Sequence, residues 1–93
     1  MATERISRDS PSPPLQALWW LREGKLAMGK EWRKAHEICQ SNEGDHTHDL
    51  VHALAHWIEG DEANANYWYA RVRDTRAATI EAEWQRIAKL LVG

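Results

Sequence analysis

Apolar side chains recur every three or four residues along most of the chain, which is the period of an amphipathic helix. The first such run spans residues 14–29. Ser12 is its expected N-cap, and two prolines occupy the first turn, where their missing N–H groups cost nothing. Apolar residues form two neighbouring lines along this helix. One line contains Leu15, Leu18, Trp19 and Leu26, and the other contains Ala17, Trp20, Leu21 and Met28. We expect one long helix here, with a kink at Gly24.

A second helix is expected over residues 31–41, followed by the helix-breaking segment SNEGD. A third helix begins at Asp45 or Thr47, either of which can act as its N-cap, and stops at Gly60. The expected inward positions are Trp32, Ala35, Ile38 and Cys39 on the second helix and Leu50, Val51, Leu54, Trp57 and Ile58 on the third.

Two more helices complete the pattern. Asp61 is expected to cap the fourth, EANANYWYARV, and Asp74 or Thr75 to open the fifth. The fifth carries an apolar stripe of Ile80, Trp84, Ile87 and Leu91. No segment alternates as a strand does, so the sequence predicts an all-α fold of about five helices.

Composition limits the domain organisation and the partners. Residues 1–13 mix Ser, Pro and charges without apolar periodicity and are expected to form a mobile tail, which leaves 14–93 as one helical domain. A net charge of −2 disfavours nucleic acid as a partner. No apolar run approaches the roughly 20 residues of a membrane span, and the N-terminus lacks a signal-peptide core, so we expect a cytoplasmic protein without a membrane partner.

A repeat connects the two halves of the chain. ALWWLREGK begins at residue 17 and ALAHWIEGD at residue 53, an offset of 36 residues. This is close to the roughly 34-residue period of tetratricopeptide hairpins. The repeat predicts two tetratricopeptide-like antiparallel hairpins with the fifth helix as a C-terminal cap. Because such arrays usually need about three repeats, two hairpins need further stabilisation from the cap, the tryptophans or a second subunit, and we expect a homodimer.

Several signatures, ALWW, KEWRKAHEICQ, HALAHWIEGDEANANYWYARV and EAEWQRIAKLL, span roughly residues 15–92. On these signatures the chain resembles an uncharacterised family of short bacterial all-helical proteins. The segment EGDEANANYWYARV also looks like the turn and second helix of a tetratricopeptide or Sel1-like repeat. The resemblance implies an all-helical fold and no particular activity.

Histidines recur at steps of four in HTHDLVHALAHW, at positions 48, 52 and 56. On a helix they form a line with about 6 Å between neighbours, roughly opposite the apolar arc of the same helix. A polar face whose histidines are bonded to carboxylates or exposed to water is the favoured interpretation. The other follows from the short SNEGD turn: if the second and third helices are antiparallel, His36 lies at the height of His52 and His56.

Three converging imidazoles could hold zinc or another divalent metal, with water or Glu59 in the fourth position. Cys39, one turn from His36, could instead supply a thiolate. Catalysis by Cys39 is disfavoured, because a small thiol of this kind is usually buried and inert. No glycine-rich phosphate loop or dinucleotide fingerprint is present, so a nucleotide-dependent enzyme is disfavoured.

Tyr67, Trp68 and Tyr69 are consecutive, so a helix cannot direct all three rings into one core. Packing between the hairpins is the favoured explanation of this run. The alternative is a partner-binding surface, for which the candidate residues are Trp57, Tyr67, Trp68, Tyr69 and Arg71. The function expected from the sequence is thus a small helical protein-interaction or self-association module. The alternative is a metal-binding protein, or a metal-dependent enzyme, that uses His36, His52 and His56.

Overall fold

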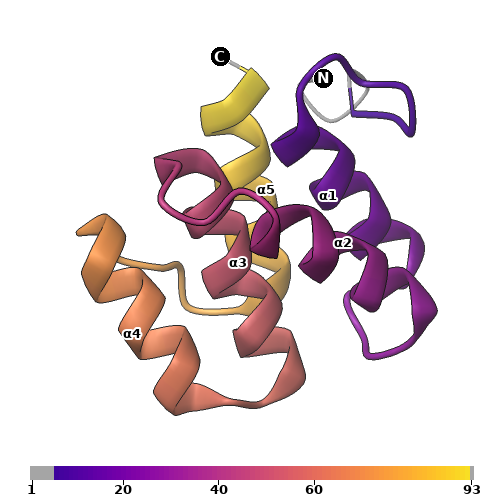
Figure 1. The fold of residues 1–93 in the computed structure, drawn as a ribbon. Coiled ribbons are helices and arrows are strands. Elements are labelled where there is room, and N and C mark those ends of the chain that lie inside the picture. Colours follow the sequence, from indigo (N-terminus) through magenta and orange to yellow (C-terminus); the bar gives the residue numbers. More distant parts are fainter. Residues whose placement is uncertain (1–5, 93) are drawn as a thin grey trace.

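The computed structural model describes residues 6–92, which form five helices and no strand. The helices are α1 (Pro13–Glu23), α2 (Lys30–Gln40), α3 (His46–Glu59), α4 (Glu62–Val72) and α5 (Ile80–Val92). The predicted all-α class is therefore confirmed. Figure 1 shows α3 in the middle of the molecule, with the other helices around it.

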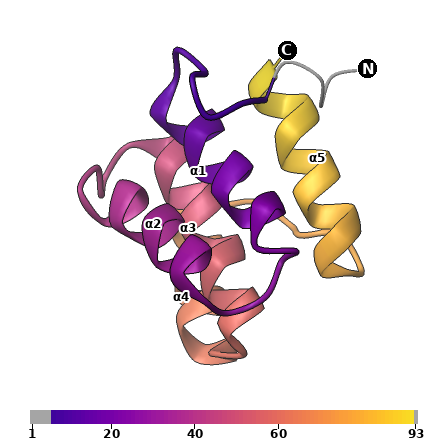
Figure 2. The same cartoon turned by 90° about the vertical axis from the view of Figure 1, so that its right-hand side faces the viewer.

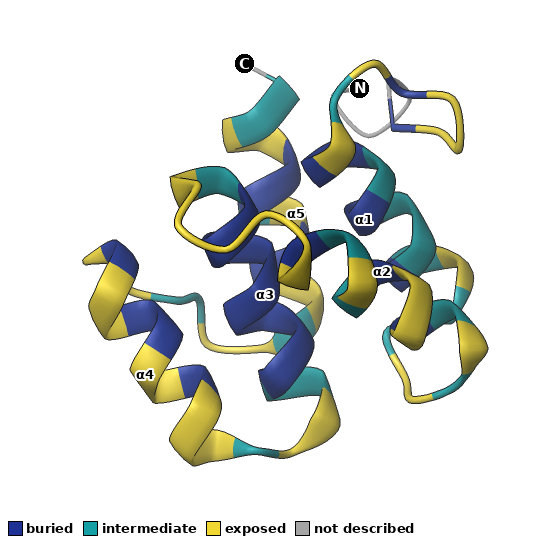
Figure 3. Cartoon of the chain, in the orientation of Figure 1, coloured by how far each residue is buried: buried dark blue, intermediate teal, exposed yellow. Residues whose placement is uncertain are grey.

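Helix α3 contacts α1, α2, α4 and α5, and for this reason it is buried on nearly every face (Figure 3). Every residue from His48 to His56 is buried, including the histidine line. The interpretation of that line as a solvated face is therefore wrong. Helix α4 covers the side of α3 that the sequence pattern left open to water.

Two side-chain contacts show that α2 and α3 are antiparallel. The Trp32 indole N–H donates to the Ala55 carbonyl at 2.8 Å, and His36 meets His52 one turn further along α2 and one turn back along α3. Helix α4 is antiparallel to α3 in the same way, since Trp68 stacks on His52 while Arg71 approaches Asp49. The predicted pairing of neighbouring helices is present.

Helix α5 closes the bundle by packing on α1 and α3 (Figure 2). Its Trp84 indole N–H donates to the Leu18 carbonyl of α1 at 2.9 Å, across 66 residues of sequence. The expected stripe faces inward: Trp84 and Ile87 are buried, and Ile80 and Leu91 are partly buried. Repeat arrays contact only their immediate neighbours. Here the last helix contacts the first, and four helices surround α3. The likeness to tetratricopeptide repeats stays a prediction.

The capping residues explain most helix ends. The Asp45 carboxylate accepts from the His48 backbone N–H, and Asp61 accepts from that of Asn64, so Asp45 rather than Thr47 is the N-cap of α3. Gly60 ends α3 with φ +87°, as expected for a C-terminal glycine. Ser12 precedes α1 as predicted, but its side chain makes no capping hydrogen bond.

The long first helix predicted over residues 14–29 is wrong in its second half. Helix α1 ends at Glu23, where Leu26 N–H bonds to Leu21 O and Lys25 N–H to Arg22 O, which is the Schellman pattern. The residues with positive φ at this helix end are Lys25 (φ 58°) and Leu26 (φ 55°), which directly follow Gly24. Gly24 instead allows close packing, because a Cβ there would lie 2.9 Å from Glu31 Cβ.

The start of the fifth helix also differs from the prediction. Helix α5 begins at Ile80, and the Thr79 hydroxyl accepts from the Ala82 N–H at 3.1 Å as an N-cap would. Asp74 is occupied elsewhere, since its carboxylate accepts from Arg86 and from the Thr75 N–H. Residues 73–79 consequently form a connection between α4 and α5 rather than a first helical turn.

Part of the expected N-terminal tail is packed against the domain. Ile6 is 2% exposed, and its carbonyl accepts from the Arg22 guanidinium at 3.0 Å. The Ser10 carbonyl accepts from the Gln16 side chain at 2.6 Å. The tail prediction is therefore wrong for residues 6–12, because an apolar side chain finds a site on the bundle. Residues 1–5 lie outside the described part of the chain, as does Gly93.

None of the five helices in residues 6–92 is long and apolar enough to span a bilayer.

Candidate metal centre

Three imidazoles meet between α2 and α3. The ring centroids of His36 and His52 are 4.8 Å apart, those of His36 and His56 5.2 Å, and those of His52 and His56 4.8 Å. One ligand atom from each of the three lies within 4.8 Å of the other two. The convergence expected from the antiparallel pairing of the two helices is confirmed.

Two indoles form walls around this cluster. The Trp32 ring stacks on His36 with centroids 4.9 Å apart and an interplanar angle of 11°. Trp68 of α4 stacks on His52 at 4.5 Å and 26°. The Trp32 N–H is held by the Ala55 carbonyl, so that ring is fixed in place. The stacking limits the orientations that His36 and His52 can adopt.

Burial sets the protonation state of the cluster. His52 is 2% exposed and His56 8%, whereas His36 is only partly buried. Burial, followed by the neighbouring positive charge of His56, lowers the pKa of His36. The same causes, with His36 added, lower the pKa of His52 to about 4. These two imidazoles are therefore neutral near pH 7, which is the form that binds metals.

The His36 and His52 Nε2 atoms are 3.2 Å apart. In a tetrahedral zinc site with bonds of 2.0–2.1 Å, neighbouring nitrogens are about 3.3–3.4 Å apart. The spacing is also that of a hydrogen bond between two neutral imidazoles, in which one nitrogen donates and the other accepts. In the hydrogen-bonded form only the accepting nitrogen has a lone pair, so metal binding requires the other ring to move its proton from Nε2 to Nδ1.

Glu59 lies beside His56 and orients it. Its carboxylate Oε1 is 2.9 Å from His56 Nδ1. A carboxylate that accepts from one imidazole nitrogen makes the other nitrogen a better ligand, as in carboxylate–histidine–zinc sites. Glu59 was one of two candidates for the fourth position, beside water, and in this arrangement its Oε1 supports His56 instead.

Cys39 does not join the cluster. Its side chain is fully buried, and burial together with the nearby Asp49 charge raises the pKa of the thiol far above its usual range. A protonated, inaccessible thiol is neither a metal ligand nor a nucleophile. The alternative site that used a Cys39 thiolate has no support, and the expectation that Cys39 is not catalytic agrees with this burial.

His48, the remaining member of the histidine line, is directed elsewhere. Its Nδ1 lies 2.7 Å from the Asp45 carboxylate at the start of α3. His56, Glu59 and Asp61 form a second group whose ligand atoms lie within 4.8 Å of one another. The Asp61 carboxylate is occupied there by the Asn64 backbone and side-chain N–H groups, so it serves as a cap.

The residues proposed for partner binding differ in their exposure to solvent. Tyr67 is 54% exposed and accepts from the exposed Arg71 guanidinium at 3.1 Å, while Trp68 and Tyr69 are buried. Trp57 is partly buried beneath the guanidinium of Arg76, which lies 4.5 Å from its ring centre. The prediction that the three consecutive rings cannot share one core is confirmed, and packing accounts for two of them.

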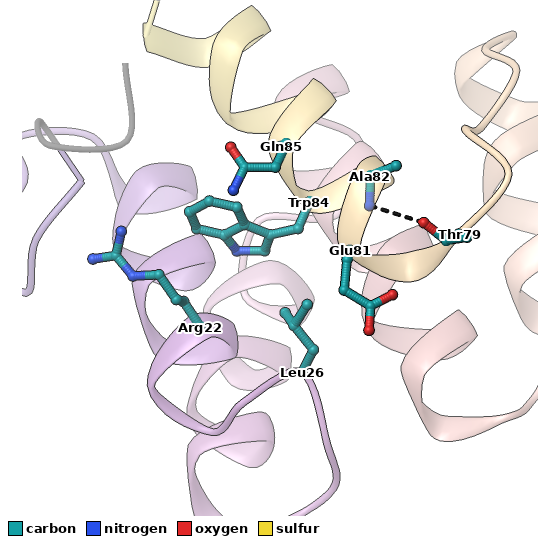
Figure 4. A pocket seen from close by; sticks show the side chains of 7 residues that line it. All are labelled: Arg22, Leu26, Thr79, Glu81, Ala82, Trp84 and Gln85. Carbon is teal, nitrogen blue, oxygen red and sulfur yellow. Dashed lines mark hydrogen bonds between the residues drawn. The ribbon is translucent and has the colours of Figure 1, made fainter. Parts of the chain in front are cut away.

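Sequence reasoning missed a hollow between the end of α1 and the start of α5 (Figure 4). It measures about 430 Å³ and is lined by Arg22, Leu26, Thr79, Glu81, Ala82, Trp84 and Gln85. The sequence held no signal for it, because Leu26 was placed on a continuing helix and the contact of α5 with α1 is long-range.

Comparisons of the chain with protein-family models, curated proteins and solved structures find no match. The resemblance to a family of short bacterial helical proteins stays a prediction.

Proposed function

We propose that this protein binds one divalent transition-metal ion through His36, His52 and His56. The observation that carries the proposal is the meeting of three imidazoles from two helices, with the His36 and His52 Nε2 atoms 3.2 Å apart. Two neutral rings, stacked indole walls and a carboxylate on His56 add to it. These are the features that a preorganised histidine site requires.

The donor set favours particular metals. Imidazole nitrogens suit Zn²⁺, Cu²⁺, Ni²⁺ and Co²⁺, whereas Mg²⁺ and Ca²⁺ require several oxygen ligands. Within residues 6–92, the three-histidine group contains neither a carboxylate nor a thiolate. We therefore expect binding of Zn²⁺ and its neighbours in the transition series, and none of Mg²⁺ at comparable concentration.

Titration calorimetry of untagged protein with Zn²⁺ tests this proposal. We expect a stoichiometry of one, a loss of at least tenfold in affinity for His52→Ala or His56→Ala, and no loss for His46→Ala. His46 is a suitable control because it is exposed and lies at the first position of the same helix. Equal Zn²⁺ affinity in all four proteins would show that the cluster is only a hydrogen-bonded part of the core.

A second candidate, self-association or binding of another protein, rests on the exposed Tyr67 ring and its contact with Arg71. Tyr and Arg are enriched in the energetically important centres of interfaces. Light scattering of the purified protein over a range of concentrations tests self-association. A dimer that dissociates on Tyr67→Ala would support this candidate, and a strict monomer at high concentration would rule out the homodimer.

A further inference from the structure

The three-histidine site supplies three protein donors and no fourth. Glu59 is the nearest carboxylate bonded to the cluster, and its Oε1 is occupied by His56 Nδ1 at 2.9 Å. Cys39 is buried and protonated outside the group. In the described chain, no Asp, Glu or Cys belongs to the group that His36, His52 and His56 form.

The indole walls cannot complete the coordination either. An indole N–H is a hydrogen-bond donor and has no lone pair to offer a metal. The Trp32 N–H is in addition bonded to the Ala55 carbonyl, and Trp68 presents its ring face to His52. Zinc bound by three protein ligands keeps a fourth position for water or another small ligand, which separates open sites from closed structural ones.

The site reaches solvent on the α2 side. His52 and His56 are buried, but His36 is only partly buried, so it is the member of the cluster that reaches the protein surface. A small ligand would approach the ion on this side. Since all three protein ligands are imidazoles, an ion held by them in neutral form keeps its full double charge and attracts an anion.

We propose that the metal ion in this site keeps an exchangeable fourth position that takes a small monodentate anion in place of water. This inference rests on the proposed metal-binding function. Ligand exchange here breaks one metal–water bond and forms one metal–anion bond, and no protein donor is lost. The site would thus belong with those that present a Lewis-acidic ion to a ligand, rather than with those that only stabilise a fold.

Visible spectroscopy of the Co²⁺-loaded, full-length protein tests the inference, with sodium azide as the probe. We expect saturable azide-dependent changes in the Co²⁺ d–d bands of the wild-type protein. Glu59→Gln should show the same response, because Glu59 contacts His56 and not the metal, although its Co²⁺ affinity should fall about 10- to 100-fold. Glu37→Gln is the control, because it removes the same charge from an exposed position on α2. This variant should match the wild-type protein in both azide response and Co²⁺ affinity.

Each other result overturns the inference in a distinguishable way. Co²⁺ uptake with spectra that azide leaves unchanged would show a filled fourth position while leaving the metal-binding function intact. If only Glu59→Gln then responded to azide, Glu59 would be the fourth ligand. Failure of the wild-type protein to take up Co²⁺ would overturn the proposed function and the open position together.

Discussion

His36 and His52 are 16 residues apart in sequence, yet their Nε2 atoms lie 3.2 Å from each other where α2 packs on α3. His36 stacks on Trp32 and His52 on Trp68, so each ring is held from behind while its nitrogen faces the other. This relationship makes the cluster sensitive to protons and to metal ions, and both responses are measurable.

Acidification should destabilise the metal-free protein between about pH 6.5 and pH 4. The pKa of His52 is near 4 in the folded protein and about 6.5 in the unfolded chain, so in this window the unfolded state binds the extra proton. The contribution of neutral His52 to stability is therefore fully present above pH 6.5. Below that pH, the free energy of unfolding falls by about 1.4 kcal/mol per pH unit for one proton. The lowered pKa of His36 acts in the same direction.

Urea unfolding in the presence of a chelator, at several pH values from 7.5 to 4.5, measures this slope. His52→Gln should remove most of it, and the exposed His46→Gln should retain it. The carboxylate cap at Asp45, whose pKa is lowered to about 2 by hydrogen bonds from Thr47 and His48, titrates below this window and does not interfere. A wild-type slope near zero would contradict the prediction.

Binding of Cu²⁺ or Ni²⁺ should quench tryptophan fluorescence. The ring centroids of Trp68 and His52 are 4.5 Å apart, and those of Trp32 and His36 are 4.9 Å apart. An ion held by these imidazoles therefore lies near two of the six indoles. Trp68→Phe should reduce the fraction quenched at saturation. Trp20→Phe is the control, because Trp20 pairs with Trp19 on α1; equal effects of the two variants would argue for binding elsewhere.

Removing the Tyr69 hydroxyl should destabilise the connection between α4 and α5. Tyr69 donates to the fully buried Glu83 carboxylate at 2.7 Å, which also accepts from Arg86 and from the Ala77 N–H. A hydrogen bond to a charged, buried acceptor contributes about 1.5–3 kcal/mol. We expect Tyr69→Phe to lower the free energy of unfolding by that amount.

Chemical denaturation of Tyr69→Phe and Tyr67→Phe gives a matched comparison. The Tyr67 hydroxyl is exposed and bonds only to the exposed Arg71 among the contacts seen in residues 6–92, so its removal should cost less than about 0.5 kcal/mol. Equal losses in the two variants would show that the buried carboxylate does not depend on Tyr69.

Replacing Arg73 by Gly should stabilise the end of α4. Arg73 occupies the left-handed conformation with φ 57°, which costs a side-chain-bearing residue roughly 1–2 kcal/mol, partly offset by the greater freedom of glycine in the unfolded chain. A net gain of about 0.5 kcal/mol is expected. Arg73→Ala should bring no gain.

The reverse change at the end of α3 should be destabilising. Gly60 has φ +87°, and a Cβ there would meet nothing within 4 Å, so Gly60→Ala introduces backbone strain alone. Thermal unfolding should show a loss of about 1 kcal/mol. A neutral Gly60→Ala would mean that the helix end relaxes into another conformation.

Local chemistry was enough to predict several features of this fold. Asp45 and Asp61 begin helices because their carboxylates accept from backbone N–H groups of the first turn. Gly60 ends α3 because a glycine adopts the left-handed conformation without steric cost. The pairing of His36 with His52 and His56 followed from helix geometry and a short turn, which set their heights without knowledge of the core. At Gly24 a kink was expected, but the chain turns left-handed at Lys25 and ends α1, so sequence reasoning extended this helix too far.

Local sequence patterns predicted five helices and the antiparallel pairing of adjacent ones, and they offered the meeting of His36, His52 and His56 as one of two interpretations, because each depends on contacts within a turn or between adjacent elements. The tertiary structure alone decided that α3 is buried on nearly every side, that α5 returns to α1, and that indoles enclose the imidazoles. The reason is physical: helical periodicity reveals one apolar face, but a second face is buried only when a distant helix covers it.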